Sequence, residues 1–222
     1  MTAKEHMTNL MKLTGICPIL ASAEPDSAVP AAQALVAGGL PMMEVLMKDE
    51  TSVQNMAKIA KEVPELFVGA GTVLTEDQAK RVIDLGAKFV VLPGFSSKVV
   101  EVCLKNDIMV LPGCVTPTEI MMALDYGIKT VKFFPVFQMG GTATLAQYNG
   151  GPFPEVRFVV TGALNSDNFL QLLEYPGTMA AGGDWMFQDH NALKNRDFDQ
   201  IASNMRESVM RVQDMRNAKT RK

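Results

Sequence analysis

The stretch KFVVLPGFSSKVVEVCLKNDIMVLPG, residues 88–113, decides the fold class, because two apolar runs of strand length flank a segment with helical spacing. Both runs end in Leu-Pro-Gly, at 92–94 and at 111–113. Nearly continuous apolar runs are typical of parallel strands that are covered on both faces. The stretch therefore predicts a strand, a helix and a second strand parallel to the first.

The same unit recurs along the chain. The apolar runs begin at Ile16, Met42, Leu66, Lys88, Ile108, Thr130, Val156 and Met179. Segments of helical period follow at 27–36, 52–60, 76–85, 98–104, 117–124, 141–148, 166–173 and 199–215. Thr75, Thr116 and Asn165 are predicted helix caps. Eight units in 222 residues favour a (β/α)8 TIM barrel over an open doubly wound sheet. We expect one domain over residues 1–222, with an extra N-terminal helix.

Composition limits the partners. The formal net charge is −3, with 47% hydrophobic and 20% charged residues, as in an ordinary globular protein. No basic patch predicts binding to nucleic acid or to an acidic membrane, and no run of 18 apolar residues predicts a membrane span. Three cysteines, without C-x-x-C spacing, sit in apolar runs, which favours a reducing compartment. We expect a cytoplasmic protein that acts on small molecules.

Function in this fold is carried by residues at the carboxyl ends of the strands. Polar residues at these places are Glu44, Lys48, Thr72, Lys132, Thr161 and Asp184. The two histidines, His6 and His190, both lie outside the predicted strands. A catalytic zinc site or a histidine base inside the barrel therefore has little support. We predict neither a metal nor a cofactor.

Lys132 is the main candidate for chemistry, because it lies between apolar residues in the strand TVKFFP. An exposed lysine could lift its ammonium group to water. Inside a barrel strand, however, a buried ion costs several kcal/mol or becomes neutral, and a neutral amine attacks carbonyls to form a Schiff base. Such chemistry needs a proton carrier, and Glu44 in MMEVLM fits that role. A purely structural ion pair between the two residues is the alternative.

Several motifs in order resemble one known family. They are GGLPMMEV, VGAGTVLT, LPG, PGCVTPTE, VKFFP, GPFPEVRFVVTG and GGDW, from about Ile16 to Met186. Together they are similar to the bacterial 2-keto-3-deoxy-6-phosphogluconate (KDPG) / 4-hydroxy-2-oxoglutarate (KHG) aldolases. The resemblance implies a trimeric (β/α)8 barrel and a metal-free class I aldolase, a lyase that yields pyruvate and an aldehyde.

The resemblance also implies roles for single residues. Lys132 matches the Schiff-base lysine of the family, and Glu44 matches its general acid/base. Thr72 matches a residue near the pyruvyl carboxylate, and Pro93 matches a proline that lines the pocket. Thr161 and Gly162 match the site of the substrate tail. For the two threonines, a capping or turn role is an equally good interpretation.

Departures from the family pattern concern the substrate. Lys48 stands where the family has arginine, which removes a two-pronged anion contact. The TGG and GGS turns that hold phosphate in the family are here TGA, ending at Ala163, and Gly182-Gly183-Asp184. Ala163 narrows the approach and disfavours a positive φ. A carboxylate at Asp184, about 4 Å from a phosphate, would disfavour it by about 4 kcal/mol at an effective dielectric near 20.

The hypothesis is therefore a non-phosphorylated 2-keto-3-deoxy sugar acid, whose neutral polyol tail Asp184 would accept. In the alternative, Asp184 turns outward or caps the next segment, which leaves the 6-phosphate open. KHG is a further alternative, although its aldehyde product is also an anion. A barrel sugar isomerase and a catalytically silent trimeric scaffold are rival functions.

Overall fold

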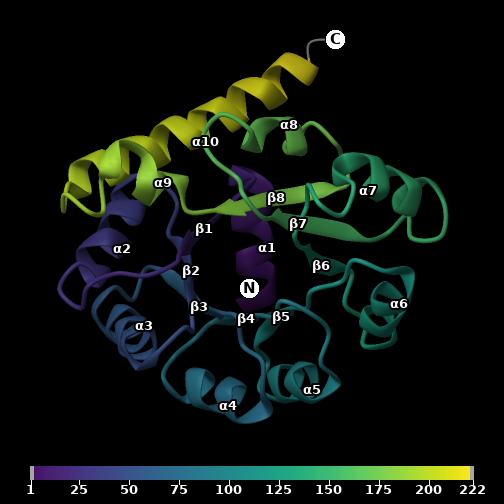
Figure 1. Ribbon diagram of the computed structural model, residues 1–222, viewed down its shortest axis with the longest axis horizontal. Helices are drawn as coiled ribbons and strands as arrows, with labels where there is room; N and C mark the ends of the chain where they lie inside the picture. The colour runs from purple at the N-terminus through teal and green to yellow at the C-terminus, as the bar shows by residue number, and fades with distance from the viewer. Residues whose placement is uncertain (1–2, 221–222) are drawn as a thin grey trace.

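The computed structural model describes residues 3–220, and the side chains of residues 5–219, as eight parallel strands surrounded by helices (Figure 1). The strands are β1 (Ile16–Leu20), β2 (Met42–Leu46), β3 (Phe67–Gly71), β4 (Phe89–Val91), β5 (Met109–Leu111), β6 (Thr130–Phe133), β7 (Arg157–Thr161) and β8 (Thr178–Gly183). The helices are α1 (Ala3–Thr14), α2 (Ala28–Ala37), α3 (Glu50–Glu62), α4 (Glu76–Asp84), α5 (Ser97–Lys105), α6 (Pro117–Asp125), α7 (Gly141–Gly150), α8 (Phe169–Leu173), α9 (Trp185–Gln188) and α10 (Phe198–Thr220), with a 3-10 turn, η1, at Asp189–Asn191.

The sheet curls into a barrel in the order β5-β4-β3-β2-β1-β8-β7-β6, and every neighbouring pair is parallel. Between the two end strands, β5 and β6, the described residues form a single isolated bridge, Gly113 with Lys132. There the Lys132 N–H donates to the Pro112 carbonyl, and the Cys114 N–H donates to the Lys132 carbonyl, both at 2.9 Å. We call this closure the seam. The predicted (β/α)8 barrel is confirmed.

The helix starts follow local chemistry. Thr75 and Thr116 each form a capping box with the residue three positions on, as their cap prediction requires. The predicted bonding of Asn165 is present, because its side chain accepts from the amides of Asp167 and Asn168, but it stands in a turn and α8 begins only at Phe169. The last predicted strand, which starts at Met179, ends at Gly183, because Trp185 already begins the short helix α9.

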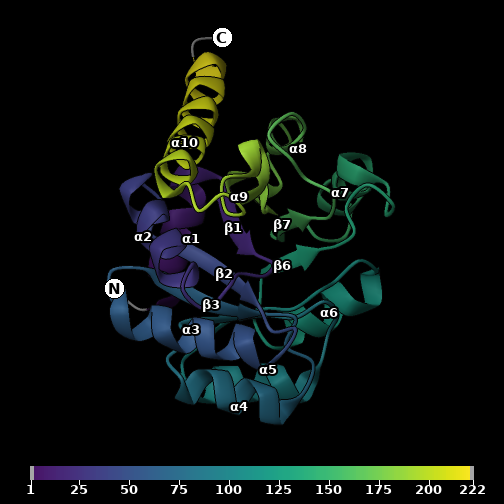
Figure 2. The same ribbon diagram turned by 60° about the vertical axis from the view of Figure 1, so that its left-hand side comes forward.

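The N-terminal helix expected from the sequence is present as α1, which lies across one end of the barrel (Figure 1). It buries Met7 and Met11 completely. The guanidinium group of Arg216, on α10, donates to the last carbonyls of α1, those of Lys12 and Leu13, at 2.6 and 2.7 Å. Figure 2 shows that the C-terminal part of helix α10 extends beyond the barrel. Among the described residues, no helix combines the length and the apolar character that crossing a bilayer requires.

Candidate active site

A cavity of about 380 Å³ opens where the strands of the barrel end. Seven of the nine predicted site residues line it: Thr72, Pro93, Lys132, Thr161, Gly162, Gly183 and Asp184. Thr161 and Gly183 are the last residues of β7 and β8, so the cavity occupies the carboxyl-terminal face of the barrel. This is the face on which barrel folds assemble their active sites.

Lys132 and Glu44 meet beside this cavity. Their side chains are 9% and 2% exposed, and Nζ lies 3.6 Å from Oε1 of the carboxylate. This distance is an ion-pair contact but is too long for a hydrogen bond, and Oε1 has no hydrogen-bond partner among the described residues. The ammonium group also lies 5.7 Å from the centre of the Phe134 ring. A buried lysine thus stands next to a carboxylate oxygen that makes no hydrogen bond among the described residues.

Glu44 is held in place by its neighbour on the next strand. It pairs with Gly69 in the β2–β3 ladder, and two residues further on, Gly71 lies against its side chain. A methyl group at Gly71 would collide with the carboxylate and would lie 2.7 Å from Cγ. Only glycine leaves this room. Sequence reasoning passed over Gly71, although a glycine inside a strand is a known sign of close approach.

Cys17 on β1 lies within electrostatic reach of the pair. Burial raises the pKa of its thiol far above the ordinary value, and the negative charge of Glu44 adds to this, while Lys132 lowers it. The thiol therefore stays protonated near neutral pH and is a poor nucleophile. Lys132 therefore remains the candidate nucleophile of this site.

Two threonines, one of them with an unusual backbone conformation, also line the cavity. Thr161 is 4% exposed, and its Oγ1 has no hydrogen-bond partner among the described residues. Thr72 has a φ of 58°, which is rare for a β-branched residue. Strain of this kind persists where the surrounding structure fixes a residue, often at functional sites. Both side chains are placed to meet a polar ligand.

Ala163 corrects an expectation. Its φ is 53°, so the methyl group does not keep this turn out of the left-handed region. The reason is local, because the Asn168 side-chain amide donates to the Ala163 carbonyl at 3.0 Å and holds the turn. The backbone therefore keeps a shape that usually favours glycine.

This conformation predicts that Ala163→Gly stabilises the protein. A left-handed alanine costs about 1–2 kcal/mol, and part of the gain is lost to the extra freedom of glycine in the unfolded chain. We expect a net gain of about 1 kcal/mol in the free energy of unfolding, measured by urea denaturation. Ala143→Gly, at an exposed helical position in α7, is the control and should lose stability. A loss at Ala163 as well would contradict the prediction.

Of the two remaining charged residues that were predicted for the site, one lies outside the cavity and one lines it. Lys48 is exposed and does not line the cavity, so the structure does not bring it to the other site residues. Asp184 is half-buried, lines the cavity and makes no side-chain bond to the start of α9, which removes the alternative that it caps this helix. Within residues 3–220, no cluster of His, Cys, Asp and Glu could hold a metal ion.

The comparisons with known proteins agree with this geometry. The family model for KDPG and KHG aldolase matches residues 7–204. The chain belongs to this aldolase family. A KHG/KDPG aldolase of Escherichia coli is 39% identical over 206 residues, which cover 93% of this chain and 96% of the relative. A 2-dehydro-3-deoxy-phosphogluconate aldolase of Treponema pallidum is 38% identical over 85% of this chain and 89% of its own.

Solved structures of the KDPG/KHG aldolase family superpose on this barrel. The Legionella pneumophila KDPG aldolase, which captured pyruvate as a covalent carbinolamine, has a TM-score of 0.85 at 30% identity over 90% of this chain and 97% of its own. The Zymomonas mobilis enzyme with 3-phosphoglycerate has a TM-score of 0.83 at 30% identity over 93% and 96%. This KDPG/KHG aldolase family member is therefore an enzyme of the lyase class.

Proposed function

We propose that the protein is a class I aldolase that cleaves a 2-keto-3-deoxy sugar acid to pyruvate and an aldehyde through a Schiff base on Lys132. The observation that carries the proposal is the buried pair of Lys132 and Glu44, 3.6 Å apart beside the cavity. The neutral amine of a lysine attacks a carbonyl, and Glu44 lies close enough to exchange protons with it. The captured carbinolamine of the Legionella relative supports the same chemistry here.

The reaction balances with these two side chains alone. The Lys132 amine adds to the C2 carbonyl, and the carbinolamine loses water to form an iminium ion. A base removes the proton of the C4 hydroxyl group, the C3–C4 bond breaks, and its electron pair moves into an enamine as the aldehyde leaves. C3 is then protonated, and water releases pyruvate and the free amine. Glu44 is the group positioned to carry these protons, and it touches the amine.

The test is covalent trapping. Pyruvate with sodium borohydride should reduce the iminium to a stable secondary amine, which peptide mass spectrometry would locate at Lys132. An adduct on another lysine, or none on folded protein, would overturn the proposal. Because the chain belongs to the aldolase family, the two rival functions, a sugar isomerase and a catalytically silent scaffold, are less well supported than the aldolase. KHG should also be tested as a substrate in a cleavage assay, because the E. coli relative is named a KHG/KDPG aldolase.

For the substrate tail we favour a non-phosphorylated acid. Asp184 supports this, since its carboxylate lines the cavity without a cap bond to α9. Ala163 does not support this preference, because its turn keeps the positive φ that glycine would have in the family pattern. Asp184 is half-exposed to solvent, so screening reduces its repulsion of a phosphate well below the value for a buried pair.

Asp184→Asn tests the role of this charge. We expect the variant to raise kcat/KM for the 6-phosphate by about tenfold, equivalent to about 1.4 kcal/mol, and to change kcat/KM for the free sugar acid little. Steady-state kinetics on both substrates gives the ratio. Asp189→Asn, on the nearby 3-10 turn and outside the cavity, is the charge-matched control. A wild-type preference for the phosphorylated acid, unchanged in Asp184→Asn, would sink the hypothesis.

We also propose a homotrimer in the cytoplasm. Large apolar side chains stay exposed on one chain, and among them are Phe134, Phe137 and Met139 after β6 and Met121 on α6. A surface on which such side chains gather is typical of an interface between subunits. Light scattering should give a mass near three times the 24.2 kDa of one chain. A monomer at micromolar concentration would contradict the proposed trimer.

The proposed location in the cytoplasm has separate support. The three buried, free cysteines are typical of a reducing compartment.

A further inference from the structure

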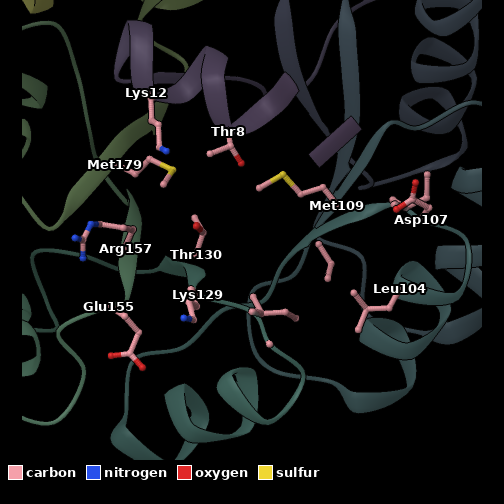
Figure 3. Close-up of a pocket in the computed structure, with 14 residues that line it drawn as sticks. Thr8, Lys12, Leu104, Asp107, Met109, Lys129, Thr130, Glu155, Arg157 and Met179 are labelled. Atoms are coloured by element: carbon pink, nitrogen blue, oxygen red, sulfur yellow. The ribbon is translucent and has the colours of Figure 1, made fainter. Parts of the chain in front are cut away.

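A second cavity, of about 500 Å³, lies at the opposite end of the barrel from Lys132. The first residues of β5, β6 and β7 line it, namely Met109, Thr130 and Arg157, and so does Met179 near the start of β8. The amino-terminal ends of parallel strands lie at one face, so this is the face that α1 crosses. We call the space the seam cavity, and Figure 3 shows Thr8, Met109, Thr130 and Met179 around it.

The seam explains why this cavity exists. All other neighbouring strands of the barrel form ladders, whereas β5 and β6 share one described bridge, at Gly113 and Lys132. That bridge lies toward the carboxyl ends of the two strands. Toward their amino ends, no further pairing joins Met109 to Thr130 within the described residues. The space left between the strands opens beneath α1.

The lining is apolar inside and basic at the mouth. Met109, Val110, Ile128 and Met179 are buried and form the inner wall. Lys12 and Lys129 are exposed at the rim, and neither has a carboxylate within ion-pair distance among the described residues.

Other charged groups at the rim leave the two lysines available. The Arg157 guanidinium is occupied, since it donates to the Pro154 and Val156 carbonyls and turns outward in Figure 3. The carboxylates of Asp107 and Glu155 also line the cavity, so the rim carries three cations and two anions. Counted over all five groups, Arg157 included, the net charge of the rim is +1.

We propose that the seam cavity binds a small amphipathic anion and that binding holds β5 and β6 together. A ligand with a compact apolar body would cover the four apolar side chains, and its anionic group would meet the ammonium groups of Lys12 and Lys129. Cavities of this size and composition are typical of small-molecule sites. This site is separate from the cavity of the aldolase chemistry.

The expected consequence reaches Lys132 through its backbone. Thr130, which lines the seam cavity, and Lys132 are two residues apart on β6 and so face the same side of the strand. The N–H groups of Lys132 and Cys114 make the two bonds that cross the seam. A ligand that binds only the closed seam lowers the population in which these bonds are open.

The experiment uses the full chain and 8-anilinonaphthalene-1-sulfonate, an apolar ring system with one negative charge. We expect saturable binding of one dye per chain in a fluorescence titration. Hydrogen exchange of the Lys132 and Cys114 amides, followed by NMR or mass spectrometry, should slow by about tenfold at a dye concentration about ten times Kd. Exchange in α3 should not change.

Two variants locate the site. Thr8→Trp fills the cavity from the half-buried face of α1 and should abolish the binding. Lys12→Glu with Lys129→Glu should weaken it by at least tenfold, whereas Lys58→Glu with Lys61→Glu, exposed on α3, is the charge-matched control. Circular dichroism checks the fold of each. Equal affinity in all variants, or binding without protection of the two seam amides, would overturn the proposal. The dye and exchange readouts do not depend on aldolase activity.

Discussion

Lys132→Ala is expected to lose the borohydride-trapped pyruvate adduct completely and to show no measurable aldol cleavage. The amine is the only group at this position that can form the iminium ion, and without it the electron pair of the breaking C3–C4 bond has no acceptor. Trapping followed by peptide mass spectrometry, together with a pyruvate-release assay, measures both losses. Lys88→Ala, at an exposed lysine just before β4, is the control and should keep both signals.

Stability must be separated from chemistry in this test. Removing one partner of a buried ion pair leaves the other uncompensated and costs about 3–5 kcal/mol, and Glu44 is 2% exposed. Lys132→Met combined with Glu44→Gln removes both charges and keeps the volume, so it should fold better than either single change. A folded double variant that still traps pyruvate at another lysine would contradict the role of Lys132.

The second large effect is expected from Gly71→Ala. A methyl group there displaces the whole Glu44 side chain, since it would approach both the carboxylate and Cγ. Loss of a positioned acid/base group lowers kcat by about 10²–10⁴-fold. Steady-state kinetics should therefore place Gly71→Ala close to Glu44→Gln, and the borohydride adduct should form more slowly in both.

Gly150→Ala provides the comparison, because nothing lies within 4 Å of a methyl group at that position on α7. It should leave kcat unchanged. If Gly71→Ala kept the wild-type kcat in a folded protein, Glu44 would not be the proton carrier. A wild-type rate of adduct formation in Glu44→Gln would point the same way.

The sequence predicted the strands well because each is an almost unbroken apolar run, and parallel strands need little else to be visible. Lys132 and Glu44 stood out for the same reason, as charges within such runs. Gly71 did not, since its role is a missing side chain beside Glu44: the strand register places Gly69 opposite Glu44, and the contact with Gly71 is visible only in the structure. The placement of Lys48 outside the cavity depends on a loop, where apolar periodicity carries no information. The single domain over residues 1–222 stays a prediction.

Turn geometry was harder to predict than strand placement. Ala163 adopts a left-handed conformation because Asn168 holds its carbonyl, and Asn165 caps the turn before α8 rather than the first turn of α8 itself. Both outcomes depend on side-chain bonds between residues a few positions apart. Propensity describes one residue at a time and does not contain these bonds.

The bonds from Arg216 to the end of α1 also bear on how the chain is made. They join residues 203 and 204 positions apart, and β1 likewise waits for β8 as its second neighbour. On the ribosome, the first strand therefore keeps an open edge until β8 has emerged. Contacts between the ends of a chain form late and slowly, and open strand edges invite pairing with other chains. We expect nascent chains that stop before β8 to depend on chaperones, because β8 covers the open edge of β1.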